Sequence, residues 1–445
     1  MERNTTVIIV VMLIVGLGIG GGIGYYAAPA KVVEKPGETV TVTVEVQPLD
    51  GKTVRIGDIQ STDVGLETET PFVESILGPD INAIAAKLGY DVTFEFLVDS
   101  AASQAAIHLE KVQSFKAMDI GLVIGGRWSS QAQAALSYVN ENNMLLFSPS
   151  STSPILAIAD DNLYRMCPDD TVQAPAIAEM LWSWGIKAII VIQRGDAWAD
   201  GIYNILEKEY PARGGVIAER IRYAAEVTEF SSYLQTAEEK AQALVAEYGA
   251  EHVAIEIISF SEAVTMVTQA KDYPTIYSLM WFGSDGTSMT QQFVDDAPEE
   301  SSHLKIFSTL AAPAASPKYT ALYDRYYALV SQPFGYYTAC TYDIATTLLT
   351  GVLETQSTDP SDIIPLIHDI TFNQWGASGW TRLNEAGDRY ASNYDIWGYG
   401  EGPDGEVTFV KYGLYDGTTG KVTWYSTGVT TGGEETAGVT PPGQG

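Results

Sequence analysis

Short apolar runs rich in β-branched residues alternate with amphipathic stretches along most of this chain, in two consecutive series. Strand-like runs of the first series begin at Val54, Asp91, Ile120 and Met144. Those of the second series begin at Lys187, Gly214, Val253 and Ser278. Because this order is typical of parallel sheets covered by helices, the sequence predicts two α/β lobes in tandem with a cleft between them.

A third pattern, near the C-terminal end, consists of strand-like runs without helices between them. These runs begin at Trp380, Tyr394, Glu406 and Lys421. Successive strands without crossover helices are typical of antiparallel pairing. We therefore expect an antiparallel ribbon attached to one of the lobes.

The charge balance narrows the choice of partners. The chain has 445 residues, of which 46% are hydrophobic, so it can bury a large core. Its 56 acidic and 25 basic residues give a net charge of −31. Such a chain repels the phosphate backbone, which argues against a nucleic acid as partner.

The N-terminal segment Val7–Ala28 is apolar and uncharged, and as a helix it is long enough to cross a hydrocarbon core of about 30 Å. We expect residues 1–28 to be a retained membrane anchor, with the globular part outside the cell. The alternative is a signal peptide cleaved near Ala28-Pro29-Ala30, which would release a secreted protein.

Both ends of the globular region are flanked by segments poor in large apolar residues. Residues 29–52 include the alternating run TVTVTVEV from Thr39, and we expect a Thr/Val-rich extended stalk. The alternative is a strand that pairs with the edge of a neighbouring molecule. Residues 427–445 are rich in Gly, Thr and Pro, so a disordered tail is expected there.

Motifs for catalysis or metal binding are missing. The four histidines, at positions 108, 252, 303 and 368, are far apart in the sequence, and there is no phosphate-binding loop or nucleophile elbow. The acidic pair Asp169–Asp170 is expected in a solvent-exposed loop. The sequence therefore predicts no metal, no cofactor and no enzymatic activity.

Cys167 and Cys340 are the only cysteines of the chain. In an exported protein they could form a disulfide. Two buried free thiols are the alternative, and the sequence leaves the choice open.

Hydroxyl side chains follow two neighbouring strands of the first predicted sheet. GGRWSS (125–130) ends one strand and begins a helix, and SPSSTSP (148–154) ends the next. Because a helix N-terminus stabilises negative charge, Ser129 and Ser130 could hold a carboxylate. Helix capping by Ser129 and a simple turn at Ser150 are the alternatives.

In the order and spacing of its motifs, the chain resembles the leucine/isoleucine/valine-binding protein family. The motifs include GGRWSSQAQAAL, SPSSTSP, YRMCPDD, VIQRGDAWADG, FGSDG, ACTYDIATTLLTG and WTRLNEAGDR, and the match covers about residues 53–426. The resemblance implies a two-lobed Venus flytrap of the type I periplasmic binding protein class. One lobe would comprise residues 53–167 and 306–370, and the other residues 168–305 and 371–426.

The resemblance also implies roles for individual residues in the cleft. Ser129 falls on the position that holds a ligand carboxylate, and Ser150 and Thr152 fall on positions that accept from an ammonium group. Asp285 falls on an acidic position that faces the ammonium, although an Asp before Gly could also start a turn. Trp198 and Phe260 differ in type from the family's aromatic residues, which changes the expected preference for the ligand side chain.

Three functions are compatible with these features. The leading hypothesis is an extracytoplasmic solute-binding protein that captures a small polar ligand, such as an amino acid or amide, for an ABC permease. A ligand-sensing ectodomain and a self-associating cell-surface subunit are the alternatives, since the same fold and the Thr/Val-rich segment could serve either.

Overall fold

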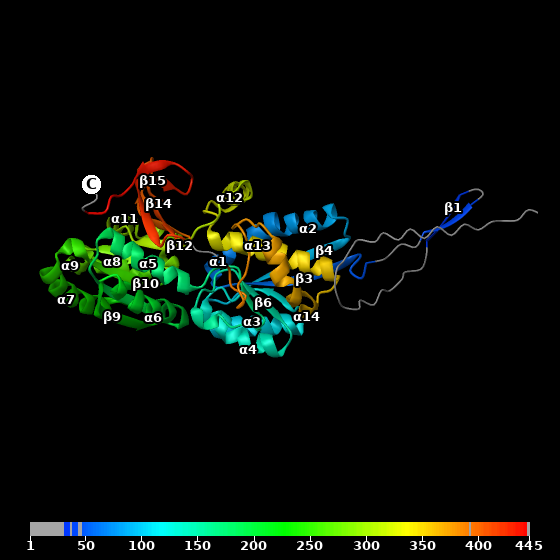
Figure 1. Ribbon diagram of the computed structural model, residues 1–445, viewed down its shortest axis with the longest axis horizontal. Helices are drawn as coiled ribbons and strands as arrows, with labels where there is room; N and C mark the ends of the chain where they lie inside the picture. Colours follow the sequence, from blue (N-terminus) through cyan, green and yellow to red (C-terminus); the bar gives the residue numbers. More distant parts are fainter. Residues whose placement is uncertain (1–30, 36–37, 43–46, 391–392, 443–445) are drawn as a thin grey trace, which may run out of the picture.

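The computed structural model of the protein describes residues 31–35, 38–42, 47–390 and 393–442. Within these ranges no helix combines the length and the apolar character needed to cross a bilayer. The predicted membrane segment Val7–Ala28 lies outside the described residues. Two α/β lobes lie end to end along the long axis of the molecule (Figure 1).

The first lobe has a five-stranded parallel sheet with the order β4-β3-β5-β6-β7. Its strands are β3 (Lys52–Gln60), β4 (Val92–Ser100), β5 (Leu122–Ile124), β6 (Leu145–Ser148) and β7 (Leu163–Arg165). Its helices are α1 (Asp63–Phe72), α2 (Gly78–Lys87), α3 (Ala105–Ala117), α4 (Ser129–Glu141), α12 (Pro317–Val330), α13 (Tyr336–Thr355), α14 (Pro360–Ile363) and α15 (Ile367–Asn373).

The second lobe has a nine-stranded sheet with the order β16-β15-β14-β13-β12-β11-β10-β8-β9. The parallel strands are β8 (Ala188–Gly195), β9 (Val216–Ala224), β10 (Val253–Ile258), β11 (Met280–Gly283) and β12 (Phe307–Ala311). The antiparallel ones are β13 (Tyr394–Glu401), β14 (Val407–Asp416), β15 (Lys421–Thr430) and β16 (Glu435–Ala437). The helices are α5 (Asp170–Trp184), α6 (Ala197–Ala212), α7 (Ser231–Tyr248), α8 (Ala263–Ala270), α9 (Pro274–Tyr277), α10 (Gln291–Asp296) and α11 (Pro298–Leu304).

Each sheet has an apolar core on both faces, as continuous apolar strands require. In the first lobe α1, α2 and α13 cover one face and α3 and α4 the other. In the second lobe α7 and α8 pack on one face, and α5 and α6 on the other. Three of the four runs predicted for the ribbon form the β13–β15 meander, which extends the second sheet beyond β12 (Figure 1). The run from Trp380 forms only isolated bridges, so its prediction as a strand was wrong.

The chain crosses between the lobes three times. The first crossing lies between β7 and α5, the second between β12 and α12, and the third between α15 and β13. Because β12 pairs with β11 and β13, it belongs to the second sheet. The first-lobe segment expected from residue 306 therefore begins after Ala311.

The segments that flank the lobes differ from expectation. β15 continues to Thr430 and β16 pairs with it, so the expectation of a disordered tail from residue 427 was wrong for this part. Backbone hydrogen bonds to β14 and β16 hold this segment in a strand, although its Gly- and Thr-rich composition favours a coil. In the expected stalk, β1 (Lys31–Lys35) and β2 (Glu38–Val42) form an antiparallel hairpin, so β2 pairs within its own chain.

Glu256 is a buried carboxyl side chain in the middle of β10. Its neighbours on the same face, Ala254 and Ile258, belong to the core beneath α5 and α6. Glu256 has no exposed surface, and neither carboxyl oxygen has a hydrogen-bond partner among the described residues. Burial raises the pKa of Glu256 well above its ordinary value. The folded protein therefore keeps this side chain protonated and neutral.

Replacing Glu256 with Met is expected to increase stability at neutral pH. The wild-type carboxyl has a higher pKa folded than unfolded, so folding takes up a proton, and stability falls as pH rises above the unfolded value. The slope from this group is about 1.4 kcal/mol per pH unit until the folded pKa is reached. Urea unfolding across neutral pH should show a smaller loss for Glu256→Met than for wild type. Glu354→Gln, at an exposed position of α13, is the control, and parallel pH profiles for all three proteins would contradict the assignment.

Candidate ligand-binding cleft

Two loops of the first lobe meet at the carboxyl edge of its sheet. The loop after β5 leads into α4, whose first residue is Ser129, and the loop after β6 carries Ser150–Ser153. The Ser129 hydroxyl is almost fully buried and accepts from the Ser153 N–H at 3.1 Å and from the Ser151 hydroxyl at 3.3 Å. The structure therefore brings the two predicted hydroxyl clusters together, because β5 and β6 are parallel neighbours.

The remaining hydroxyls of these loops differ in their contacts. Ser150 donates to the Arg127 carbonyl at 2.9 Å, whereas half-buried Ser130 makes no side-chain hydrogen bond within the described residues. Thr152 is 3% exposed, and its hydroxyl lies beside the carboxyl group of Asp170, whose pKa it lowers through a hydrogen bond.

Arg127 fixes the position of the loop after β5. Its guanidinium donates to Asp58 at 2.9 Å and to Glu69 at 3.0 Å, and also to the Thr341 hydroxyl at 3.0 Å. Burial raises the pKa of Glu69 to about 8, with the nearby Asp58 also raising it and Arg127 opposing the shift. The backbone next to Ser129 is thus anchored by a buried network of charged groups.

Arg165 holds the second loop and joins two of the crossings. Its guanidinium donates to the carbonyls of Ser151 at 3.1 Å and Ser153 at 2.8 Å. The same group makes a two-point ion pair with Asp388, with 2.7 Å between Nη2 and Oδ2. Arg165 precedes the first crossing and Asp388 lies in the third, so the position of the loop depends on both.

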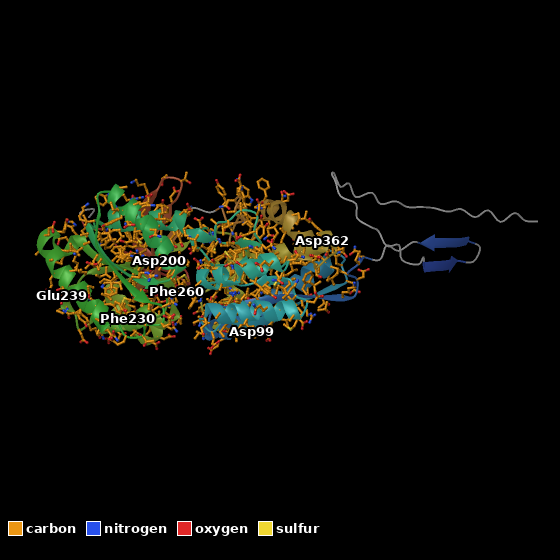
Figure 2. All side chains as sticks on the ribbon, turned by 90° about the horizontal axis from the view of Figure 1, so that it is seen from below. Asp99, Asp200, Phe230, Glu239, Phe260 and Asp362 are labelled. Carbon is orange, nitrogen blue, oxygen red and sulfur yellow. The ribbon has the colours of Figure 1, made fainter. Side chains whose placement is uncertain are left out.

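The second lobe places a stack of aromatic rings against the first. Phe260, after β10, lies between the indole rings of Trp198 on α6 and Trp128 of the first lobe. The ring centroids are 4.3 Å apart for Trp198 and 4.6 Å apart for Trp128, with interplanar angles of 11° and 6°. Figure 2 shows Phe260 where the two lobes meet. Ser153 adds a hydrogen bond between the lobes, to the Ala197 carbonyl at 2.8 Å.

Asp285 lies just after β11 and is the first residue of the 3-10 turn Asp285–Thr287, so it does start a turn, but its side chain bonds to other parts of the chain. Its Oδ2 accepts from the Tyr337 hydroxyl at 2.6 Å, and its Oδ1 accepts from the Gln173 amide at 3.0 Å. Burial raises its pKa, and these two hydrogen bonds oppose the shift. Trp198 and Phe260 border the same place, because a Cβ added at Gly286 would meet both rings.

Asp170 was expected in a solvent-exposed loop, and this prediction was wrong. Asp169 caps α5, but Asp170, the next residue, is fully buried. Its pKa is raised well above the ordinary range, first by burial and then by the charge of Asp285, and a hydrogen bond with the Thr152 hydroxyl opposes this shift. The sequence carried one indication of this burial, because Asp170 falls in the first turn of a helix whose other residues are largely apolar. Two carboxyl groups therefore share this part of the cleft.

Cys167 and Cys340 are buried free thiols, the second of the two alternatives. Cys167 donates to the Ser151 carbonyl and Cys340 to the Met166 carbonyl. Burial raises the pKa of Cys340 to about 12 and that of Cys167 well above its ordinary value. Both thiols are thus protonated and unreactive at neutral pH.

The chain belongs to the family described as receptor family ligand binding region, which matches residues 79–402. An uncharacterized protein of Methanocaldococcus jannaschii is 26% identical over 395 residues, covering 83% of this chain and 91% of that protein. The candidate site residues all lie within the range that matches this family.

Solved structures of binding proteins have the same fold. The leucine-binding protein LivK from Thermotoga maritima has a TM-score of 0.65 at 20% identity, covering 80% of this chain and 97% of its own. LivJ from Streptococcus pneumoniae, in complex with isoleucine, has a TM-score of 0.67 at 18% identity, and the match covers 84% of this chain and 100% of LivJ. A solute-binding protein of an ABC transporter from R. palustris, in complex with benzoate, has a TM-score of 0.63 at 15% identity. That match covers 81% of this chain and 96% of the other protein. The fold is that of a type I periplasmic binding protein.

Replacing Trp128 with Ala removes the only ring that the first lobe contributes to the described stack. An aromatic pair of this kind contributes about 0.5–1.5 kcal/mol beyond the burial of its surface, so closure of the lobes should weaken by up to about tenfold. Small-angle X-ray scattering of the ligand-free protein should show a larger radius of gyration. Trp375→Ala, at a ring that is 60% exposed, is the matched control. Identical scattering from both variants would contradict a role for the stack in closure.

Proposed function

We propose that this protein is the extracytoplasmic solute-binding component of an ABC importer and that its cleft closes on a small polar ligand with an ammonium group, in the simplest case an amino acid. The observation that carries the proposal is the polar group at the junction of the lobes, where the buried side chains of Asp170 and Thr152 lie near Asp285 and no ion pair within the described residues joins either carboxyl group to a basic side chain. An ammonium group would supply such a partner.

In this proposal each lobe has a different part in recognition. The first lobe supplies neutral groups from Ser129, Ser130, Ser150 and Thr152, next to the N-terminus of α4. The second supplies Asp285 for the ammonium group, with Trp198 and Phe260 as apolar walls beside it. A ligand that touches both sets stabilises the closed arrangement over the open one, because it binds fully only when the lobes meet.

The membrane anchor and the permease complete the proposal. Val7–Ala28 would tether the receptor to the outer face of the membrane, near the permease that accepts the ligand. Similar structures include substrate-binding proteins of transporters in complex with isoleucine and with leucine, the latter of an ABC transporter, which supports the same class of function here. A self-associating surface subunit has less support, because the strand β2 that would pair with a neighbour pairs with β1.

A thermal-shift screen of the globular region, from about residue 47, tests the receptor function. A ligand at a hundred times its Kd adds about 2.7 kcal/mol to the free energy of unfolding. We expect at least one compound among amino acids, amides and small amines to raise the Tm. If no compound in this panel does so, the protein is not a receptor of this class.

Asp285→Asn should weaken binding of that ligand by about 10- to 100-fold, because a charge-assisted hydrogen bond in a closed cleft contributes about 1.5–3 kcal/mol. Calorimetric titration measures the loss. Asp296→Asn, at an exposed position of α10, is the control and should bind as wild type does. Equal affinity of the two variants would show that Asp285 does not face the ligand.

A further inference from the structure

Three aromatic rings stack at the junction of the lobes, and the middle one fills a gap of one ring's thickness. The ring of Phe260 lies 4.3 Å from the indole of Trp198 and 4.6 Å from that of Trp128, centroid to centroid. Interplanar angles of 11° and 6° make the two indoles nearly parallel to each other. Because Trp128 belongs to the first lobe and Trp198 to the second, the indoles form a flat slot between the lobes, which holds one planar ring.

Both indoles are held in place at the N-termini of helices. Trp198 lies in the first turn of α6, where its backbone N–H donates to Asp196 at 3.1 Å, and its buried side chain is also hydrogen-bonded to Asp285. Trp128 directly precedes α4, and its carbonyl accepts from the Gln131 N–H at 2.9 Å. The two walls of the slot therefore keep their positions when its content changes.

Phe260 is attached differently, because it belongs to neither a helix nor a strand. It lies in the bend between β10, which ends at Ile258, and α8, which begins at Ala263. Its carbonyl accepts from the Ala263 N–H at 3.1 Å, so the backbone of the bend is fixed. The side chain is half-buried, and a change of its χ1 rotamer takes the ring away from both indoles without a change of the backbone. Phe260 is therefore the ring of the stack that can move.

The cost of moving Phe260 depends on what replaces it. Loss of its ring removes two stacked pairs and uncovers apolar surface on both indoles. A planar aromatic ring of a ligand restores both pairs, whereas water restores neither and a puckered aliphatic ring is thicker than the slot. Since the exchange of one aromatic ring for another is nearly neutral, the polar contacts of the ligand decide whether it occurs.

Two hydrogen bonds next to the stack fix the distance between its walls. The Ser153 hydroxyl of the first lobe donates to the carbonyl of Ala197, the residue before Trp198, at 2.8 Å. The Tyr337 hydroxyl, also from the first lobe, donates to Asp285 at 2.6 Å. A planar ring in the slot leaves both hydrogen bonds intact, but a thicker group would stretch them.

The slot ends beside the carboxyl group proposed for the ammonium group of the ligand. A Cβ added at Gly286 would lie 2.6 Å from the Trp198 ring and 3.0 Å from that of Phe260. Gly286 follows Asp285 directly, and its lack of a side chain keeps this end of the slot free. A small molecule with a short linker between its ring and its amino group can therefore reach both the slot and Asp285.

On the basis of the proposed function, we infer that Phe260 is a movable placeholder and that the aromatic ring of the ligand takes its place between Trp128 and Trp198. The cleft then selects aromatic amino acids and arylalkylamines over aliphatic ones. In the empty protein Phe260 lines the cleft and covers both indoles, and it turns aside when a ligand ring enters. The side chain of Phe260 therefore competes with the ligand.

Matched pairs of probes test the preference for a planar ring in the wild-type protein. L-Phenylalanine is compared with 3-cyclohexyl-L-alanine, and phenethylamine with 2-cyclohexylethylamine, so that both members of a pair have the same charge and the same number of carbon atoms. Calorimetric titration measures the affinities. We expect each aromatic probe to bind at least about tenfold more tightly than its counterpart, because it alone stacks on both indoles.

Phe260→Ala tests the placeholder directly, because a placeholder and a wall predict opposite results. Removal of a competing ring should strengthen the binding of L-phenylalanine by about tenfold. Loss of a wall would weaken it. Phe372→Ala, at a ring of α15 that is 52% exposed, is the matched control and should bind as wild type does. The Tm of each ligand-free variant verifies that it is folded.

The outcomes separate this inference from the proposed function. If a cyclohexyl compound binds as tightly as its aromatic counterpart, or if Phe260→Ala binds L-phenylalanine no more tightly than wild type does, the inference is wrong and the receptor function stands. The same holds if an aliphatic compound of the wider screen binds while every aromatic probe fails. If no compound of either panel raises the Tm, both proposals are wrong.

Discussion

The buried guanidinium of Arg165 is the interaction on which the cleft depends. A charge with no exposed surface is costly unless it is fully paired, and Asp388 together with the carbonyls of Ser151 and Ser153 provides that pairing. One side chain thereby joins the end of β7, the third crossing and the loop that carries Thr152. The position of the hydroxyls in this loop is consequently tied to two of the crossings.

The two lobes contribute different chemistry to their contact. The first provides hydroxyls, backbone groups and the ring of Trp128, held by the buried networks around Arg127 and Arg165. The second provides the carboxyl groups of Asp170 and Asp285 and two further rings. The contact of Trp128 with Phe260 forms only when the lobes meet, and the Tyr337 hydroxyl of the first lobe then also donates a hydrogen bond to Asp285 of the second, so both contacts favour closure.

Much of this arrangement could be predicted from the sequence because it follows from local patterns. The alternation of strands and helices gave the two lobes, and parallel strands necessarily align their carboxyl ends, which brought Ser129 next to Ser153 and put Asp285 at the end of β11. The stacking of Trp128 on Phe260 and the burial of Asp170 depend on contacts between segments that are distant in the sequence. The spacing of residues along the chain does not predict such contacts. The strand β16 was missed for the same reason, since its Gly- and Thr-rich surroundings indicate a coil until β15 provides a partner.

The order of the crossings has a consequence for the way the chain is made. The sheet of the first lobe is complete at Arg165, but one of its faces is covered by α13, which is separated from it by the whole parallel part of the second lobe. During synthesis from the N-terminus, α1 and α2 can cover this face only in part, and the core around apolar side chains such as Ile56 and Phe147 is complete only when Tyr336–Thr355 has been made. The five parallel strands of the second lobe are therefore synthesised before the last helix that the core of the first lobe needs.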